Sequence, residues 1–396
     1  MAPTSSLFCG PLDLAGEGVD TVLANAVTRA GVDRIAPAVA YHDARDVLPH
    51  NPRRRVATGG AGVCFVPDPG LYQGLALRPR RSEFAAGRDL LAEVCERAPG
   101  HGAAVDAWAV YLHDDHPGVR PGTVRNLFGD PYPHVLCPAD PEVRAYAVAL
   151  TRDICRYPVG TLLAEAPHWL PYEHGAGHER CSAPLDDTAR LLLGLCFCAH
   201  CRQAADTRGV PAADLVKAAR AHVEACLAGR PPDPATLPAT LPAALLPAYL
   251  EARCDVVSAL LADLTAEAAA AGVAFRLLDL SAGLLGWADG RPAGPPGVTR
   301  TAELGVRPAD LPCPVTVTAY ARDPERVRLE TAAYRARTGG PVGVALRPMT
   351  PDCHSAENLA QKLRAAAADR VDFYHYGLSP LPALDLIRRA RAIAAT

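Results

Sequence analysis

The stretch Val159-Gly160-Thr161-Leu162-Leu163-Ala164-Glu165 is an apolar run of strand length that ends in a carboxylate. Seven similar runs, rich in Val, Ile, Phe and Tyr, recur along the 396 residues, and longer Ala/Leu/Arg segments with helical spacing separate them. In chain order, the predicted strands are roughly Leu7–Leu12, Arg34–His42, Ala104–His113, Gly160–Pro167, Ala274–Leu280, Pro314–Ala321, Pro341–Pro348 and Val371–Gly377. Strands and helices that alternate with right-handed crossovers form a parallel sheet, and eight such units close into a (β/α)8 barrel.

The alternative architecture is an open, doubly wound sheet. It is disfavoured because no Gly-x-Gly-x-x-Gly turn follows the first predicted strand. Barrels of this class run long as one domain, so we predict a single TIM-barrel domain over residues 1–396. Long loops over residues 43–81 and 114–140 follow the second and third strands, and an insertion over residues 168–205 follows the fourth. Loops that follow strands form the C-terminal face of a barrel, where active sites are built.

Composition excludes several classes of partner. The net charge is -3, and no Lys/Arg stripe interleaved with aromatics occurs, so we expect no nucleic-acid partner. No run of about 18 apolar residues and no basic, then apolar, leader is found, so we expect no membrane span and no export. Thirteen irregularly spaced cysteines suit a reducing cytoplasm better than a disulfide framework. Two Lys against many Arg indicate a GC-rich, and we expect bacterial, genome.

Three thiols lie within six residues in Cys196-Phe197-Cys198-Ala199-His200-Cys201. Zn²⁺ prefers four soft or borderline ligands in a tetrahedron, and this spacing lets several sulfurs surround one ion. The best fourth ligand is Cys137, in an irregular proline-flanked segment, and the runners-up are His200, Cys181 and His178. Four thiolates leave no open position for water, so the zinc is expected to be structural. The alternative interpretation is a set of ordinary buried cysteines.

Glu165 is the first candidate for chemistry, because it ends the fourth predicted strand and therefore faces the mouth of the barrel. Pro167, His168 and Trp169 follow it, and such apolar surroundings raise the pKa of a carboxyl group, as a general acid requires. The alternative is a structural glutamate bonded to a neighbouring strand.

Aromatic, imidazole and carboxylate side chains recur at other strand ends, in Tyr41-His42-Asp43, Leu112-His113-Asp114-Asp115 and Tyr374-His375-Tyr376. Such a mouth suits a carbohydrate or glycoside, whose hydroxyls need paired donors and acceptors and whose C–H faces stack on aromatic rings. A catalytic metal held by these residues has no support from a His-x-His or His-Glu-x-x-His spacing.

Three features follow one another along the chain: Leu136-Cys137-Pro138-Ala139-Asp140-Pro141-Glu142-Val143-Arg144, then Glu165, then the Cys-x-Cys-x-x-Cys motif. This order resembles glycoside hydrolase family 42. In those barrel β-galactosidases a cysteine before the helix that leads to strand four joins a later Cys-x-Cys-x-x-Cys to hold zinc, and the acid/base glutamate ends strand four. The resemblance implies Glu165 as general acid/base and the zinc ligands Cys137, Cys196, Cys198 and Cys201. It covers residues 130–205, and Asn126-Leu127-Phe128-Gly129-Asp130 is similar to uncharacterised bacterial barrels of hydrolase type.

Two positions depart from the family pattern. Ala164 stands where the family has Asn before the acid/base, and the seventh predicted strand ends in Val344-Ala345-Leu346-Arg347-Pro348-Met349 where the family has a nucleophilic Glu. A glycosidase needs two carboxyl groups, about 5–5.5 Å apart when retaining and about 6.5–9.5 Å apart when inverting. The candidates for the second are Asp279, Asp43, Asp114 and Asp352.

The reaction we predict has Glu165 protonate a leaving oxygen while Asp279 or another mouth carboxylate activates water, with His42 beside them. The expected substrate-binding residues are Tyr41, Asp43, His113, Trp169, Arg347 and Tyr374. Two other functions stay open: an acid/base lyase or isomerase of secondary metabolism, and a barrel without the strand-seven nucleophile that only binds carbohydrate. The oligomeric state is also open, and a homo-oligomer is compatible with the sequence.

Overall fold

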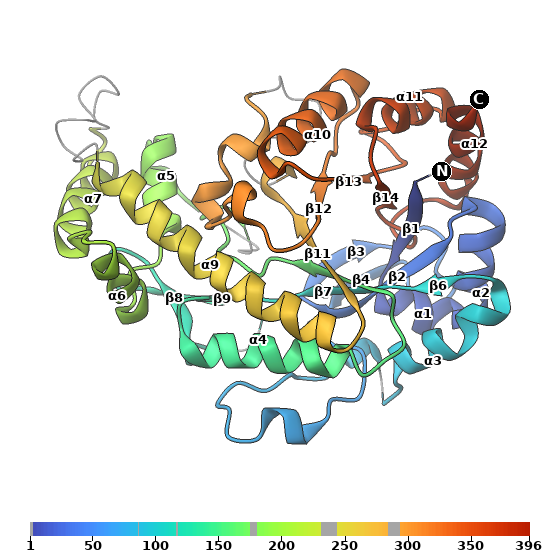
Figure 1. Ribbon diagram of the computed structural model, residues 1–396, viewed down its shortest axis with the longest axis horizontal. Helices are drawn as coiled ribbons and strands as arrows, with labels where there is room; N and C mark the ends of the chain where they lie inside the picture. The colour runs from blue at the N-terminus through green and yellow to red at the C-terminus, as the bar shows by residue number, and fades with distance from the viewer. Residues whose placement is uncertain (1–2, 86, 116–117, 175–179, 231–243, 284–293) are drawn as a thin grey trace.

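The computed structural model describes residues 3–85, 87–115, 118–174, 180–230, 244–283 and 294–396. Eight parallel strands form its central sheet, in the spatial order β1-β14-β13-β12-β11-β10-β7-β2 (Figure 1). Because β1 pairs with both β14 and β2, the sheet closes on itself. The strands are β1 (Thr4–Cys9), β2 (Arg34–Tyr41), β7 (Ala107–Val110), β10 (Thr161–Glu165), β11 (Ala274–Asp279), β12 (Val315–Thr318), β13 (Val342–Leu346) and β14 (Arg370–Phe373). The predicted (β/α)8 barrel is confirmed.

The first and last strands are shorter at their C-terminal ends than the sequence predicts. β1 ends at Cys9 instead of Leu12, because Pro11 has no N–H for a sheet ladder and begins helix α1 (Pro11–Glu17). The backbone N–H of Gly10 donates to the Asp13 carboxylate at 2.7 Å, which holds the start of this helix. β14 ends at Phe373, so the Tyr374 side chain belongs to the loop at the mouth.

Helices pack around the barrel and connect successive strands (Figure 1). Those outside the barrel are α2 (Val19–Ala24), α3 (Leu90–Arg97), α4 (Pro141–Ile154), α9 (Leu245–Ala270), α10 (Pro324–Thr338), α11 (Ala356–Ala366) and α12 (Leu381–Ala395). Helix α12 packs against α11 and against residues 25–30, so the C-terminal helix lies beside the first βα unit. Within the described ranges, no helix is both long enough and apolar enough to cross a bilayer.

A smaller helical cluster lies to one side of the barrel, at the left of Figure 1. It consists of α5 (Asp187–Gly194), α6 (Ala199–Thr207), α7 (Ala212–Leu227) and the first turns of α9. Leu192, Leu215, Val223 and Tyr249 belong to its own apolar core. Helix α9 starts in this cluster and continues along α4 and β11, so one 26-residue helix joins the cluster to the barrel.

The loops that follow β2 and β7 each contain an antiparallel hairpin. The first pairs β3 (Ala44–Val47) with β4 (Val56–Gly59), and the second pairs β8 (Thr123–Arg125) with β9 (Pro131–Leu136). Both lie in the long loops that the sequence places on the C-terminal face.

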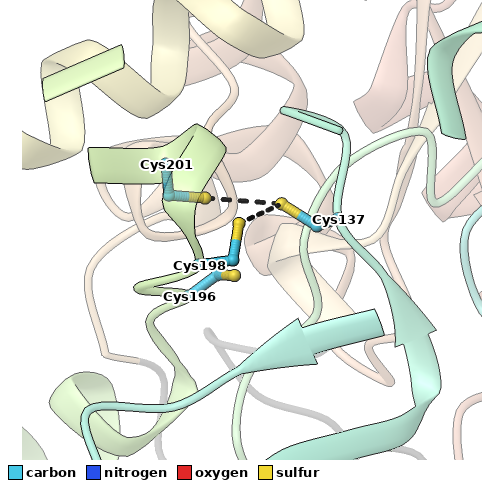
Figure 2. A group of neighbouring side chains, drawn as sticks. All are labelled: Cys137, Cys196, Cys198 and Cys201. Carbon is cyan, nitrogen blue, oxygen red and sulfur yellow. Dashed lines mark hydrogen bonds between the residues drawn. The ribbon is translucent and has the colours of Figure 1, made fainter. Parts of the chain in front are cut away.

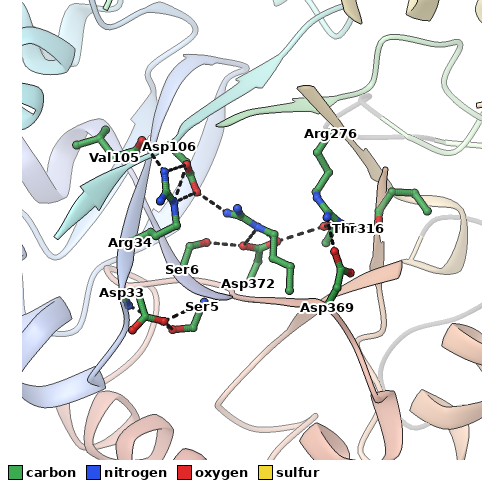
Figure 3. Close-up of polar contacts among 12 residues, drawn as sticks. Ser5, Ser6, Asp33, Arg34, Val105, Asp106, Arg276, Thr316, Asp369 and Asp372 are labelled. Carbon is green, nitrogen blue, oxygen red and sulfur yellow. Dashed lines mark hydrogen bonds and ion pairs between the residues drawn. The ribbon is translucent and has the colours of Figure 1, made fainter. Parts of the chain in front are cut away.

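A buried ionic network fills the opposite, N-terminal end of the barrel (Figure 3). Asp106 is fully buried between Arg34 and Arg370, with N–O distances of 2.6 Å to each. Arg370 also donates to Asp372 at 2.8 Å, and Ser6 donates to the same carboxylate. Buried charges are tolerated when they are paired and hydrogen-bonded, as they are here. This end of the barrel is closed by ion pairs, and chemistry belongs to the other end.

Candidate functional site

Four cysteine sulfurs converge beside the barrel (Figure 2). Cys137 follows β9, Cys196 and Cys198 lie between α5 and α6, and Cys201 is in the first turn of α6. The Cys137 Sγ lies 3.3 Å from the Cys201 Sγ and 3.8 Å from the Cys198 Sγ, and all four sulfurs lie within 4.8 Å of one another. The backbone N–H of Arg125 donates to the Cys196 sulfur at 3.4 Å. The structure thus brings together the four thiols that the sequence selects.

The runners-up for the fourth ligand lie elsewhere. The His200 Nε2 faces Asp140 at 3.6 Å, and Cys181 is exposed with its sulfur near the Ala183 carbonyl. His178 lies outside the described residues.

Glu165 is the last residue of β10 and its side chain is buried in the barrel mouth. Leu163, two residues earlier, belongs to the apolar layer inside the barrel, and alternate residues of a strand share a face. The Trp108 indole N–H donates to Glu165 Oε2 at 2.7 Å. Burial raises the pKa of the Glu165 carboxyl, while the charge of His42 and the bond from Trp108 oppose this rise.

Aromatic rings surround Trp108 at the mouth. Ring centroids lie 4.8 Å away in Phe8, 4.7 Å in Tyr41, 5.9 Å in Tyr374 and 6.1 Å in His375. Burial raises the pKa of Tyr374 to about 12, so this hydroxyl stays protonated and can donate hydrogen bonds at neutral pH. The predicted binding residues Tyr41 and Tyr374 therefore lie next to the Glu165–Trp108 pair.

Arg347 occupies the end of β13, where the family resemblance expects a glutamate. Its guanidinium carbon lies 4.0 Å from the centroid of Tyr320 and 5.8 Å from that of Tyr374, and it pairs with Asp352 at 3.3 Å. Asp352 is almost fully buried, and its backbone carbonyl accepts a 2.7 Å bond from Lys362. This strand end presents a cation over aromatic rings.

The structure does not bring Asp279 or Trp169 to the mouth. Leu278 pairs with Glu165 in register and faces the barrel interior, so Asp279 faces outward, where the backbone N–H of Ser281 donates to its Oδ1. Trp169 is 1% exposed and packs under Arg253, whose guanidinium carbon lies 4.1 Å from the ring. Asp279 is therefore on the wrong face of β11 to act with Glu165, and Trp169 is a core residue beside α9.

Two carboxylates that the sequence analysis does not select line the mouth instead. Asp46 on β3 and Asp13 on α1 line one pocket together with Tyr41, Trp108 and Tyr374. The charges of Asp46 and Glu165 both raise the pKa of Tyr41 and Tyr374, so both carboxylates act on this tyrosine pair.

The pKa values of Asp13 and Asp46 shift in the same direction. Burial raises the pKa of Asp13 to about 7, against a bond from the Gly10 N–H. Burial also raises the pKa of Asp46, and the charge of His42 opposes it. No local motif marks either residue. Asp46 belongs to the long loop after β2, whose composition is irregular. Asp13 is missed because the sequence predicts that the first strand extends to Leu12, so the start of α1 is not expected.

A cluster of imidazoles forms the other wall of the mouth. The rings of His42 and His113 stack with centroids 4.3 Å apart, and the His42 Nδ1 lies 2.8 Å from the Asp43 carbonyl oxygen. Asp43 itself accepts a 2.7 Å bond from the Ala61 N–H and its own backbone N–H donates to Asp115. The candidates His42, Asp43 and His113 are thus brought together, and Asp43 has a positioning role through its backbone.

Comparisons with known proteins support the fold. No protein-family model and no curated protein sequence matches the chain. Among solved structures, the glycoside hydrolase domain of PgaB (BpsB) from Bordetella bronchiseptica is 14% identical, with a TM-score of 0.55 over 100% of this chain and 98% of that one. The catalytic domain of β-amylase from Paenibacillus polymyxa is 11% identical, with a TM-score of 0.56 over 99% and 98%. A β-galactosidase from Marinomonas ef1 is 9% identical, with a TM-score of 0.55 over 99% of this chain and 59% of that chain. At these identities the likeness establishes a TIM barrel like that of glycoside hydrolases.

Proposed function

We propose that this barrel is a glycoside-hydrolase-like enzyme that acts on a sugar or a glycosylated small molecule, with Glu165 as general acid/base. The observation that carries the proposal is the environment of Glu165: it is buried at a strand end in the barrel mouth, it is bonded to Trp108, and burial raises its pKa. A carboxyl group that stays protonated closer to neutral pH can give a proton to a leaving oxygen.

The Trp108 bond fixes which oxygen carries the proton. An indole N–H donates only, so Glu165 Oε2 acts as the acceptor and the proton of the neutral acid resides on Oε1. We assign the second carboxylate to Asp46, which lines one pocket together with Tyr41, Trp108 and Tyr374. Asp46 either attacks the anomeric carbon or activates the water that does so, and the separation of the two carboxyl groups in the substrate complex decides between these routes.

The walls of the mouth favour a sugar as ligand. Tyr41 and Tyr374 line the mouth and offer aromatic faces for C–H stacking, and the Tyr374 hydroxyl offers a donor. Arg347 adds a cation at the end of β13. A sugar that carries a negatively charged substituent would gain from this guanidinium.

The test compares single variants on glycosides with poor and good leaving groups. We expect Glu165→Gln to lower turnover of alkyl glycosides by about 10²–10⁴, because proton transfer is lost, and to lower turnover of nitrophenyl glycosides much less. Asp46→Asn should lower turnover of both classes, whereas Asp279→Asn should not, since Asp279 faces away from the mouth. Equal losses in Asp46→Asn and Asp279→Asn, or full activity of Glu165→Gln, would contradict the assignment.

The same experiment separates the rival functions. If no glycoside in a broad panel is cleaved but sugars bind and Glu165→Gln leaves their affinity unchanged, the barrel is a carbohydrate-binding protein. If a free sugar exchanges a carbon-bound proton with deuterated water, an isomerase is indicated instead.

We also propose that the four-cysteine cluster binds a structural zinc ion. Ligands about 2.3 Å from a tetrahedral zinc lie about 3.8 Å from one another, and the Cys137 sulfur lies 3.3 Å and 3.8 Å from those of Cys201 and Cys198. Cys137, Cys196 and Cys201 are buried, and the Arg125 N–H contact with Cys196 favours a thiolate. The ion would join β9 to α6 at the base of the helical cluster and would take no part in the reaction.

A further inference from the structure

A second set of metal-ligand side chains lies in the barrel mouth, apart from the cysteine cluster. His42 follows β2, and His113 and Asp115 lie in the loop that follows β7. One ligand atom from each of these three residues lies within 4.8 Å of the other two. His113 is 7% exposed, while His42 and Asp115 are partly exposed toward the mouth.

The ligand atoms of His113 and Asp115 have the spacing expected in a coordination shell. The His113 Nε2 lies 3.5 Å from the Asp115 Oδ2, and among the described residues it makes no hydrogen bond of good geometry. Nitrogen and oxygen ligands about 2.1 Å from a tetrahedral ion lie about 3.4 Å apart. The contact with Asp115 is longer than an ordinary hydrogen bond, so the buried nitrogen is weakly paired, and an ion between the two atoms would pair both of them.

Neighbouring groups orient the three side chains. The carbonyl oxygen of Asp43 can only accept, so the His42 Nδ1 carries a proton and donates to it at 2.8 Å, which leaves the Nε2 lone pair free to bind a cation. The backbone N–H of Asp43 donates to the Asp115 Oδ2 at 2.8 Å and fixes that carboxylate. Residue Asp43 therefore holds both outer ligands, as outer-shell groups do in metal sites.

We propose that His42, His113 and Asp115 bind a divalent transition-metal ion at the barrel mouth. Two imidazoles and one carboxylate suit borderline ions such as Zn²⁺, Co²⁺ or Fe²⁺, unlike the soft all-sulfur set of the cysteine cluster. Three protein ligands leave a coordination position for water or a substrate oxygen, which is the pattern of catalytic sites. His174, whose ring centroid lies 5.2 Å from that of His113, is near enough to add a fourth imidazole after a small movement.

The site lies beside the aromatic mouth. His42 lines one pocket with Tyr41, Trp108 and Tyr374, and its ring stacks on Tyr41 with centroids 4.2 Å apart. An ion here would accept an oxygen of the ligand that sits over the tyrosine pair. This inference does not depend on glycoside hydrolysis, because it rests on the ligand geometry alone.

Cobalt(II) is the probe. The protein as purified is titrated with Co²⁺, and the weak visible d–d absorption of a nitrogen/oxygen site is followed, because cobalt bound to sulfur would show strong charge-transfer bands instead. We expect one equivalent to bind without charge-transfer bands and to be removed by a mild chelator. His42→Ala, His113→Ala and Asp115→Asn should each weaken binding by at least about tenfold. The matched control is His354→Ala, an exposed histidine beyond β13 that is outside the cluster.

A pulsed EPR spectrum of the Cu²⁺-loaded native protein gives an independent readout, in which two imidazole nitrogens should couple to the ion. It needs no variant and so stands even if a substitution prevents folding. No labile equivalent of Co²⁺, or no nitrogen coupling, would overturn the proposal. Equal affinity in His113→Ala and His354→Ala would overturn it as well.

Discussion

The position of Glu165 follows from the parity of a strand. Leu163 and Glu165 are two residues apart, so they share the inner face of β10, and the apolar residue at 163 commits the carboxylate at 165 to the mouth. Asp279 also ends a strand, but Leu278 takes the inner face of β11. A carboxylate at a strand end reaches the mouth only when it lies an even number of residues from the side chains that face the barrel interior.

Asp13 gives the residue-scale prediction, which concerns pH. Its pKa rises from an ordinary 3.8 to about 7 on folding, so the folded protein keeps a proton that the unfolded chain has released. This shift contributes roughly 4 kcal/mol to the free energy of unfolding. The contribution is fully present below pH 3.8 and is lost as the pH rises to about 7. Asp13→Asn keeps an acceptor for the Gly10 N–H and cannot ionise.

Chemical denaturation at pH 4 and pH 8 checks this. We expect the free energy of unfolding of the native protein to fall from pH 4 to pH 8. In Asp13→Asn the fall should be smaller by about 2–4 kcal/mol. Asp33→Asn, at a partly exposed site, is the control. The same slope in native protein and Asp13→Asn would mean that Asp13 is ionised in the fold.

At the scale of elements, the cysteine cluster joins parts that the chain separates. Cys137 comes from the hairpin that follows β7, and the other three cysteines come from the connection between α5 and α6. Hydrogen bonds also hold this junction: the Phe197 N–H donates to the Arg125 carbonyl at 2.7 Å, and the Tyr249 hydroxyl donates to the Cys196 carbonyl at 2.5 Å. The metal would add to the stability that these bonds provide.

We predict about one tightly bound zinc ion per chain by elemental analysis. Cys198→Ser/Cys201→Ser should abolish it and lower the unfolding temperature, because zinc binding contributes directly to folding. Cys181→Ser, which changes an exposed thiol outside the cluster, should keep both the zinc and the stability. An equivalent of zinc that the double variant retains after treatment with a mild chelator would refute the cysteine site.

At the scale of the whole molecule, the two ends of the barrel have separate tasks. The N-terminal end holds the ion-pair network around Asp106 and Arg370 (Figure 3), and the C-terminal end holds the aromatic mouth around Glu165. Both ends carry buried carboxylates, but those of the network are paired with arginines, whereas Glu165 accepts only from an indole among the described residues. At the N-terminal end, ion pairs with arginines stabilise the buried carboxylates and the fold. At the C-terminal end, Glu165 accepts from an indole instead of an arginine, so burial raises its pKa and allows it to act as an acid.

The whole-molecule prediction is that Asp106→Asn destabilises the protein by about 3 kcal/mol, because it leaves Arg34 and Arg370 without a full counter-charge inside the barrel. Glu267→Gln removes the exposed pair with Arg152 and should cost less than about 1 kcal/mol. Urea unfolding measures both. Turnover by folded Asp106→Asn should match the native value, and a large loss of turnover would show that the two ends are coupled.

Much of the fold is visible in the sequence because strand and helix periods are local. The eight predicted strands are the eight barrel strands, with errors of a few residues at ends such as Leu12, where a proline begins a helix. Three of the four cysteines could also be chosen by their spacing, whereas Cys137, which is distant in the chain, is the preferred fourth ligand among several candidates. Asp46 could not, because it reaches the mouth only through the β3–β4 hairpin, whose path no local pattern encodes.

The sequence by itself determined the barrel, the placement of Glu165 at a strand end and the Cys196, Cys198 and Cys201 motif, because each depends on hydrophobic periodicity or on short spacings. Only the tertiary structure decided which carboxylates share the mouth and that His42, His113 and Asp115 meet there. These residues come from loops after different strands, and closing the sheet sets their distances. The face of each strand residue is a matter of parity, whereas the meeting of loops depends on the packing of the whole barrel.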